Sequence, residues 1–214
     1  MNTYAVWSVT DRRAFDEQLS RLPVAEISHF PWDSAPHPNS CAVVGASLDA
    51  LHVFMRTDEE EIRAEQTEQN GPIYTDSCME FYLMPSLSSD LYLNIEVNPR
   101  GVMFFSVGRE RAQRRLITEE TPRDLNLTAK IRPSDCLGAG WTVEYDLPYA
   151  MLRKYIPEFD PHSPSMDMRG NFYKCGNGLT KPHWGMWSPV GTPKPDFHRP
   201  EFFGRLVRSQ GSQP

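Results

Sequence analysis

The sequence lacks the features that would place it in or across a membrane. No stretch of about 18 apolar residues occurs, which excludes a membrane-spanning helix. Residues 1–13 also lack the apolar run of a secretory signal peptide. The sequence as given therefore predicts a cytoplasmic protein with no membrane partner, or a secreted protein if a signal was trimmed.

Cysteine is scarce, and its spacing is uninformative for metal binding. Cys41, Cys78, Cys136 and Cys175 are widely separated, and no Cys-x-x-Cys pair occurs. Three of them lie in apolar runs typical of strands. We therefore expect reduced core thiols and not a disulfide framework.

Positive charge is also in deficit. The chain has 22 lysines and arginines against 28 acidic residues, giving a formal charge of −6. A nucleic-acid-binding domain usually carries a basic stripe with stacking aromatics. The closest approach to one, residues 109–115, is interpreted as a solvated loop. Composition therefore argues against a nucleic-acid partner.

What is present is typical of one globular domain. The 214 residues are 39% hydrophobic, enough to bury a core without disulfide or metal support. The 19 prolines and 13 glycines are scattered and indicate turns between short elements. We predict a single domain over residues 1–208 and a loose tail over 209–214.

Strand patterns dominate the chain after one predicted helix near the start, where Thr10 can cap and Phe15, Leu19 and Leu22 share a face. A second short helix is predicted over residues 148–155. The predicted strands cover residues 41–47, 51–56, 78–84, 92–98, 102–107, 125–132, 141–147, 169–175 and 201–207. Short strands separated by turn signals predict an all-β, antiparallel β-sandwich, jelly-roll-like, with one or two peripheral helices.

Two of these strands, 78–84 and 92–98, carry the most informative alternation. One face of each is purely apolar and is predicted core. The opposite faces carry the polar and aromatic residues Glu80, Tyr82, Tyr92, Asn94, Glu96 and Asn98. Carboxylates, amides and phenols match the hydroxyl groups of a sugar. The alternative is a solvent-exposed face with cross-strand hydrogen bonds.

A second candidate feature is the tryptophan pair Trp184 and Trp187, inside the proline-broken segment 181–200. The C–H-rich face of a pyranose ring packs on indole, and His183 adds a polar group beside the pair. The alternative is that one or both tryptophans close the end of the sandwich. We expect one in the core and one facing a ligand, with Trp187 favoured for the ligand.

Catalytic motifs are absent, but carboxyl groups are available. Glycoside hydrolysis needs two carboxyls flanking the scissile bond, and Asp76, Glu80, Glu96 and Glu144 are candidates. The sequence does not fix their separations. Non-catalytic binding is therefore preferred to hydrolysis of O-glycosyl bonds.

Metal-binding patterns are weak. Asp196 and His198 with Glu201 could ligate a metal, but the adjacent Arg199 favours a salt-bridged loop. The acid-rich run 58–70 is interpreted as a solvated loop, with no support of its own for calcium.

Several segments resemble the family 9-like carbohydrate-binding domains, relatives of the modules appended to bacterial xylanases that act in carbohydrate breakdown. In chain order they are residues 30–32, 74–82, 92–98, 169–176 and 183–204. The resemblance implies a β-sandwich that binds a mono- or oligosaccharide without cutting it. Calcium is bound structurally in the xylanase modules, so the resemblance implies a structural calcium ion as the cofactor to expect.

The resemblance also implies individual roles. Trp187 matches the later of two tryptophans that clamp a terminal sugar, and Tyr74 falls near the earlier one, so an aromatic ring is kept without the indole. Glu80 matches the acidic hydrogen-bond partner, and Asn171 or Asn177 the late amide. The predicted ligand-binding residues are Tyr74, Glu80, Glu96, Asn98, Asn171, His183, Trp184 and Trp187.

Two other classes of function stay open at this point. One is a glycosidase with a carboxylate pair such as Glu80 and Glu96. The other is a haem or redox sandwich with axial ligands such as His183 and Met186. The identity of the sugar and the oligomeric state are not predicted.

Overall fold

The computed structural model describes residues 1–33, 36–132, 140–163 and 166–209. The helices in these ranges are α1 (Arg12–Gln18) and α2 (Tyr149–Tyr155), with single 3-10 turns at Leu19–Arg21, Ile73–Thr75, Arg111–Gln113 and Pro200–Phe202. The strands are β1 (Thr3–Ser8), β2 (Ala25–Ile27), β3 (Ser40–Ala46), β4 (Ala50–Thr57), β5 (Cys78–Met84), β6 (Tyr92–Val97), β7 (Met103–Gly108), β8 (Arg115–Leu116), β9 (Thr128–Arg132), β10 (Gly140–Pro148), β11 (Met168–Cys175), β12 (Trp184–Met186) and β13 (Gly204–Ser209).

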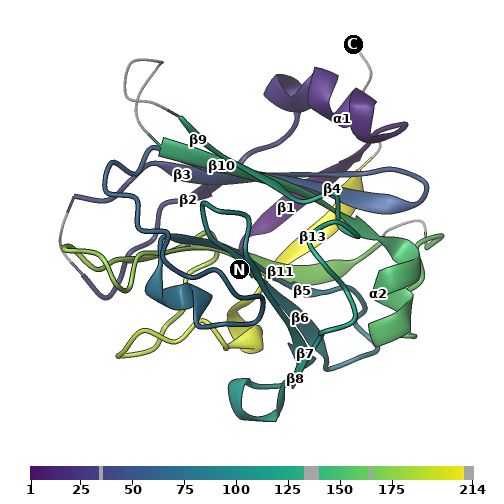
Figure 1. Cartoon of the computed structure of the whole chain (residues 1–214). Helices are drawn as coiled ribbons and strands as arrows, with labels where there is room; N and C mark the ends of the chain where they lie inside the picture. The colour runs from purple at the N-terminus through teal and green to yellow at the C-terminus, as the bar shows by residue number, and fades with distance from the viewer. Residues whose placement is uncertain (34–35, 133–139, 164–165, 210–214) are drawn as a thin grey trace.

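The strands form one curled sheet whose two halves face each other. Its hydrogen-bonded order is β8-β7-β6-β5-β11-β13-β1-β3-β4-β10-β9, with β12 added on β11 and β2 on β3. Strands β3, β4, β10 and β9 form one layer and β11, β5, β6, β7 and β8 the other, while α1 covers the outside of the first layer (Figure 1). The predicted β-sandwich with two short helices is therefore confirmed.

Strand β1 makes this sheet mixed. It pairs in parallel with both β13 and β3, whereas the other pairings described are antiparallel. The predicted strands did not include β1, so only antiparallel pairing was expected. It also placed no regular structure in residues 181–200, where the short strand β12 pairs with β11.

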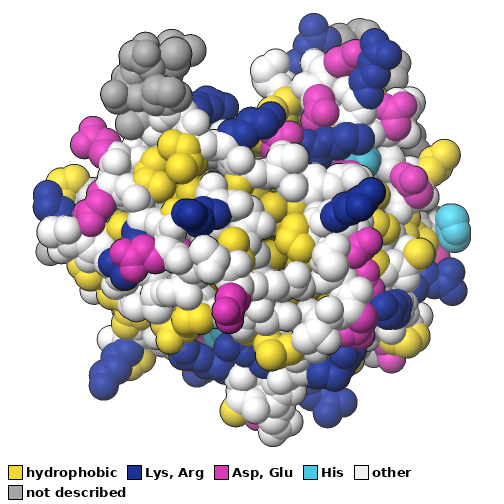
Figure 2. Space-filling view, viewed as in Figure 1, with side chains coloured by type: hydrophobic (Ala, Val, Ile, Leu, Met, Phe, Trp, Pro, Cys, Tyr) yellow, Lys and Arg dark blue, Asp and Glu magenta, His cyan; other side chains and the backbone are white. Residues whose placement is uncertain are grey.

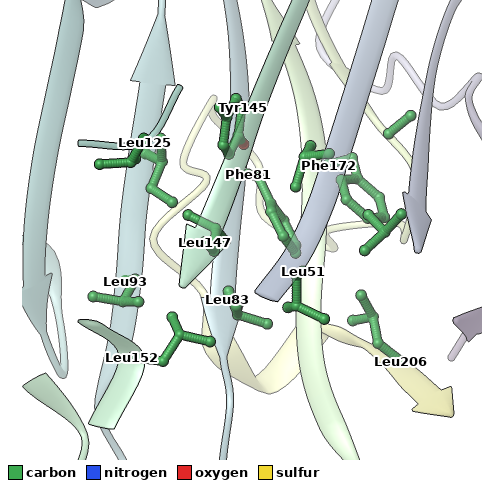
Figure 3. Packing of buried hydrophobic residues seen from close by; sticks show 14 of the residues in the cluster. Leu51, Phe81, Leu83, Leu93, Leu125, Tyr145, Leu147, Leu152, Phe172 and Leu206 are labelled. Carbon is green, nitrogen blue, oxygen red and sulfur yellow. The ribbon is translucent and has the colours of Figure 1, made fainter. Parts of the chain in front are cut away.

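The main core fills the space between the two layers. Strands β5 and β6 contribute their odd-numbered residues, such as Phe81 and Leu93, and the opposite layer contributes Leu51 and Leu147 (Figure 3). This is the apolar face that the alternation predicts, since successive side chains of a strand point to opposite faces.

The other face of β5 and β6 is also buried, although a polar face suggested contact with solvent. Every residue of both strands is buried. The chain after β11 folds back over this face, and Met186, Phe197 and Phe203 pack there against Tyr82 and Tyr173 in a second apolar cluster. The solvent-exposed alternative is therefore wrong for these strands.

The cap of the first helix and the state of the cysteines were also predicted. Helix α1 begins with Asp11 as its cap, whose side chain accepts a hydrogen bond from the Ala14 N–H, instead of the predicted Thr10. Cys41, Cys78 and Cys175 are buried and free, as predicted. Cys136 and the last five residues of the predicted tail lie outside the described residues.

The surface is ordinary for a globular domain. Acidic and basic side chains are interspersed over the face seen in Figure 2. Neither of the described helices has the length and apolar character that crossing a bilayer requires.

Candidate functional site

A cavity of about 270 Å³ opens on the outer face of β5 and β6, beneath the covering C-terminal segment. We call it the outer cavity. Its lining residues are Tyr74, Glu80, Tyr82, Glu96, Arg111, Arg114, Cys175, Asn177, Trp184, Pro195, Asp196, Phe197 and His198.

Two carboxylic acids line this cavity from adjacent strands. Glu80 on β5 is directly opposite Glu96 on β6 in the antiparallel register, so both side chains point to the same face. They are 2% and 4% exposed, respectively. Glu96 Oε1 accepts a hydrogen bond from Asn94 Nδ2 at 3.2 Å, while Glu96 Oε2 is buried without a partner. We call Glu80 and Glu96 the floor pair.

Burial dominates the ionisation of the floor pair. It raises the pKa of Glu80 well above the usual range, and the nearby charge of Glu96 raises it further. Burial also raises the pKa of Glu96 to about 6. Two adjacent buried acids cannot both ionise easily, so near pH 7 the pair holds one proton and one negative charge.

The raised pKa of Glu96 leads to a stability prediction. Its native pKa of about 6 lies above the ordinary 4.5, so the native state holds the proton more tightly than the unfolded chain. Stability from this group is present below pH 4.5 and is lost as the pH rises through 6. Glu96→Gln should therefore stabilise the protein at pH 8 by roughly 1–2 kcal/mol. Urea unfolding at pH 4.5 and pH 8 measures this, and a variant less stable than wild type at pH 8 would contradict it.

A hydrogen-bonded network closes one side of the cavity. His198 Nδ1 lies 2.8 Å from the Tyr92 hydroxyl, and its Nε2 lies 3.2 Å from the Tyr82 hydroxyl and 3.1 Å from Arg114 Nη1. Arginine can only donate, so Nε2 must accept and the ring proton sits on Nδ1. Burial, with the charges of Arg114 and Arg111, lowers the pKa of His198 to about 3. His198 is therefore neutral, and its two ring nitrogens link the side chains of Tyr92, Tyr82 and Arg114.

Two aromatic side chains line the cavity from its more exposed part. Tyr74, on the 3-10 turn Ile73–Thr75, is 46% exposed, and Trp184 at the start of β12 is half-buried. Cys175 connects them, because it pairs with Trp184 across β11 and β12 while its thiol lies 3.6 Å from the Tyr74 carbonyl oxygen. We call Tyr74 and Trp184 the aromatic pair.

Trp187 occupies a different place from the one predicted. It is 6% exposed and belongs to the main core, with its ring centroid 5.6 Å from that of Phe172 and 6.3 Å from that of Tyr4. A Cβ atom on Gly204 would lie only 2.3 Å from the indole, so the ring packs directly on this glycine. Trp187 is therefore in the core, and Trp184 is the tryptophan that lines the cavity.

The spacing of Trp184 and Trp187 explains why one tryptophan lines the cavity and the other lies in the core. In an extended segment, residues three apart point to opposite faces. Trp184 and Met186 therefore face the second cluster, and Trp187 faces the main core. Residues 181–200 were predicted to have no regular structure, so this rule was not applied to the two tryptophans.

Asn98 and Asn171, two of the predicted ligand-binding residues, form structural hydrogen bonds and do not line the cavity. Asn98 donates to Asp76 Oδ2 at 2.9 Å, and its Oδ1 accepts the N–H groups of Arg100 and Val102, which fixes the turn after β6. Asn171 Nδ2 donates to the Ser188 carbonyl at 2.8 Å, and its Oδ1 accepts the Ser188 N–H. Asn177, the alternative late amide, does line the cavity.

His183 also lies away from the outer cavity. It is 5% exposed, and its Nε2 is 3.4 Å from Glu59 Oε1. Glu59 is held by Lys174 Nζ at 2.7 Å and by Trp141 Nε1 at 3.0 Å. His183 is therefore part of a buried ionic cluster, which we call the Glu59 cluster.

Asp58, Glu59 and Glu61 of the acid-rich run do not form a calcium cage. Both carboxylate oxygens of Asp58 accept hydrogen bonds from Asn39, and both of Glu59 accept N–H donors from Lys174 and Trp141. Glu61 Oε1 accepts the N–H and hydroxyl of Thr180. Calcium needs six to eight oxygen ligands, and these oxygens already face donors.

The segment that contains Asp196 and His198 is held by salt bridges of Arg199, as predicted. Arg199 Nη2 lies 2.6 Å from Glu201 Oε1, and its Nη1 lies 3.8 Å from Asp196 Oδ2. His198 faces the tyrosines and Arg114 instead of a metal-binding group.

Two basic residues that line the cavity were not among the predicted ligand-binding residues. Arg114 and Arg111 line the cavity, although the run 109–115 was interpreted as solvated. Arg114 also lies over the Phe104 ring, with the guanidinium carbon 4.7 Å from the ring centroid. No local pattern identifies them, because the 3-10 turn Arg111–Gln113 brings them to the cavity only after β7 and β8 pair.

Solved structures share this fold across the whole chain. A candidate carbohydrate-binding protein from Bacteroides uniformis is 22% identical with a TM-score of 0.82, covering 97% of this chain and 99% of that one. A family 9 module from Caldicellulosiruptor kristjanssonii in complex with cellotriose is 11% identical with a TM-score of 0.65, covering 99% and 96%. The complex of a family 9 module from the same organism with glucose is 12% identical with a TM-score of 0.61, covering 100% and 97%.

Sequence comparison identifies the family. Among curated proteins no sequence matches this chain. The family model described as carbohydrate-binding family 9 matches residues 13–207, which is nearly the whole domain and includes every residue of the outer cavity. The chain belongs to carbohydrate-binding family 9.

Proposed function

We propose that the outer cavity binds one sugar unit of a mono- or oligosaccharide and does not cut it. The observation that carries the proposal is the aromatic pair, Tyr74 and Trp184, lining the same cavity as the floor pair. An indole and a phenol ring offer apolar faces for the C–H groups of a pyranose. Carboxyl, guanidinium and amide groups offer partners for its hydroxyls.

The size of the cavity supports a single unit. Its volume of about 270 Å³ lies just below the usual range of small-molecule sites, roughly 300–1,000 Å³. A neighbouring hollow, lined by Arg109, Glu110 and Glu201 among others, shares Arg111, Asp196 and His198 with it. The rest of an oligosaccharide would extend over this hollow.

The binding proposal is tested by calorimetry with glucose, cellotriose and a panel of other mono- and oligosaccharides. Tyr74→Ala and Trp184→Ala should each weaken binding by about tenfold or more, because burying a large side chain contributes roughly 1.5–3 kcal/mol. Trp7→Ala is the matched control, since Trp7 is half-buried and packs on a separate cluster beneath α1. Absence of binding to every sugar, or full affinity in Trp184→Ala, would refute the proposal.

The geometry favours binding over glycoside hydrolysis. The floor pair lies side by side on adjacent strands, with oxygen atoms within 4.8 Å of each other. In a glycosidase the two carboxyls flank the scissile bond from different sides. We therefore expect no release of chromophore from aryl glycosides, and hydrolysis that disappears in Glu80→Gln would reverse this conclusion.

The haem alternative has no favourable geometry at its named residues. Met186 Sδ lies 3.1 Å from the backbone nitrogen of Val190 in the second cluster, and His183 belongs to the Glu59 cluster. Met186 is therefore held in the second cluster by the Val190 N–H, and His183 is held in the ionic cluster by Glu59.

A further inference from the structure

The floor pair carries a negative charge that no described side chain neutralises by direct contact. The charges of Arg114, Lys174 and Arg111 act on the pair, but among the described residues none of the three forms a salt bridge or hydrogen bond with it, and Arg114 and Lys174 have other partners. Arg114 Nη1 donates to Asn94 Oδ1 and to His198 Nε2, both at 3.1 Å. Lys174 Nζ is 2.7 Å from Glu59 Oε1, on the opposite side of the sheet layer. A buried charge without a partner is costly, so this arrangement is unusual for a purely structural pair.

One atom marks where a partner would sit. Glu96 Oε2 has no hydrogen-bond donor among the described residues, although Glu96 is 4% exposed and lines the cavity. A ligand hydroxyl would satisfy this oxygen. A ligand ammonium would satisfy it and compensate its charge, and charge-assisted hydrogen bonds are about twice as strong as neutral ones.

We propose that the outer cavity recognises an amino sugar, with the free ammonium group of the sugar donating to Glu96 and Glu80. The proposal rests on the proposed function, because it specifies the chemical class of the sugar at the same site. An ammonium has three donors and no acceptor, which suits a floor made of carboxyl oxygens.

The charge of the floor pair by itself matches a monocation, while the guanidinium groups of Arg111 and Arg114 in the same cavity act against a bound cation. The pair holds one proton and one negative charge near neutral pH, since burial and mutual repulsion keep Glu80 protonated. A single ammonium makes the floor neutral. The aromatic pair lines the same cavity, and aromatic faces also attract cations.

A divalent metal fits this floor less well. Sγ of Cys78 and carboxyl oxygens of Glu80 and Glu96 all lie within 4.8 Å of one another, and the three residues are buried. A metal would require the thiolate, but burial raises the pKa of the Cys78 thiol well above its usual range. It would also require the proton of Glu80 to leave. The ammonium needs neither proton to leave.

The experiment compares amino sugars with their parent hexoses by calorimetry at pH 7 and low salt. The pairs are glucosamine with glucose, galactosamine with galactose and mannosamine with mannose, and N-acetylglucosamine serves as the uncharged amide. At least one amino sugar should bind tenfold or more tightly than its parent, equivalent to ~1.4 kcal/mol. N-acetylglucosamine should lose this advantage, because its amide carries no charge.

The variant Glu96→Gln tests the source of the preference. It keeps the shape of the side chain and removes the charge, so the affinity ratio of amino sugar to parent should fall to about one. The control is Glu17→Gln, which removes an exposed acid paired with Arg13 on α1, and should keep the wild-type ratio. Thermal unfolding confirms that both variants are folded.

Each remaining outcome has a distinct meaning. Hexoses that bind as tightly as their amino sugars would overturn this inference and leave the proposed function standing. A preference that persists in Glu96→Gln would also overturn it. Zinc ions that bind wild type and not Glu96→Gln, without any amino-sugar preference, would assign the floor to a metal instead. Failure of every sugar to bind would overturn both the inference and the proposed function.

Discussion

Replacing Lys174 with methionine is expected to lower the free energy of unfolding by about 3–5 kcal/mol, because it leaves the Glu59 carboxylate buried without its cation. Lys174 is fully buried and Glu59 is 3% exposed. The ammonium also donates to the Cys175 carbonyl at 2.8 Å. Methionine keeps the length and apolar character of the stem, so the loss reports the charge. Urea unfolding at pH 7 measures it.

The double variant separates charge from packing. Glu59→Gln combined with Lys174→Met removes both charges, and it should recover a large part of the stability that Lys174→Met loses. Trp141 can still donate its indole N–H to the glutamine oxygen, as it does to Glu59 at 3.0 Å. A Lys174→Met protein as stable as wild type would show that the ion pair does not support the fold.

The ion pair of Glu59 and Lys174 also makes the stability of the protein depend on pH. Burial alone would raise the pKa of Glu59, but the charge of Lys174 and hydrogen bonds from His183, Lys174 and Trp141 outweigh it and lower the pKa to about 2. The native state therefore binds this proton less tightly than the unfolded chain. Stability from Glu59 is present above pH 4.5 and is lost as the pH falls towards 2. In Lys174→Met this acid-side loss should shrink.

Replacing Trp187 with alanine is the second large expected effect, a loss of about 3–5 kcal/mol, as for other tryptophans removed from a core. The indole packs between Tyr4 and Phe172 and directly on Gly204. Its removal leaves a cavity where β1, β11 and β13 meet. Denaturant unfolding measures the loss, and Trp187→Phe should lose less because it fills part of the space.

Trp184→Ala provides the contrast for this prediction. Trp184 is half-buried at the outer cavity, so its removal should affect sugar binding far more than stability. The pair of variants thus reverses the expectation from sequence, in which Trp187 faced the ligand. A Trp187→Ala protein that keeps wild-type stability and loses sugar binding would restore the original assignment.

The strand pattern was sufficient to predict the sandwich. Period-two alternation over 78–84 and 92–98 separates an apolar face from a polar one, and burial of the apolar face requires a second layer. Strand β1 was missed because its pairing partners, β13 and β3, are distant in sequence. Parallel pairing of this kind has no local turn signal.

The structure brings together only some of the predicted ligand-binding residues. Glu80, Glu96, Tyr74 and Trp184 do line one cavity, whereas Asn98, Asn171, His183 and Trp187 are buried in structural roles. Sequence could propose residue types suited to a sugar, but the same amides and indoles also stabilise turns and cores.

The alternation in residues 78–84 and 92–98 by itself determined that Glu80 and Glu96 lie on the face opposite the core, because a strand allows no other arrangement of those side chains. Only the tertiary structure decided that this face is buried, that the two acids are opposite each other, and that Trp184 lines their cavity. The reason is physical: these features depend on strand register and on the return of the C-terminal segment. The register joins Glu80 to Glu96 across two strands, and the C-terminal segment is held by contacts between residues more than a hundred positions apart, such as that between Tyr92 and His198.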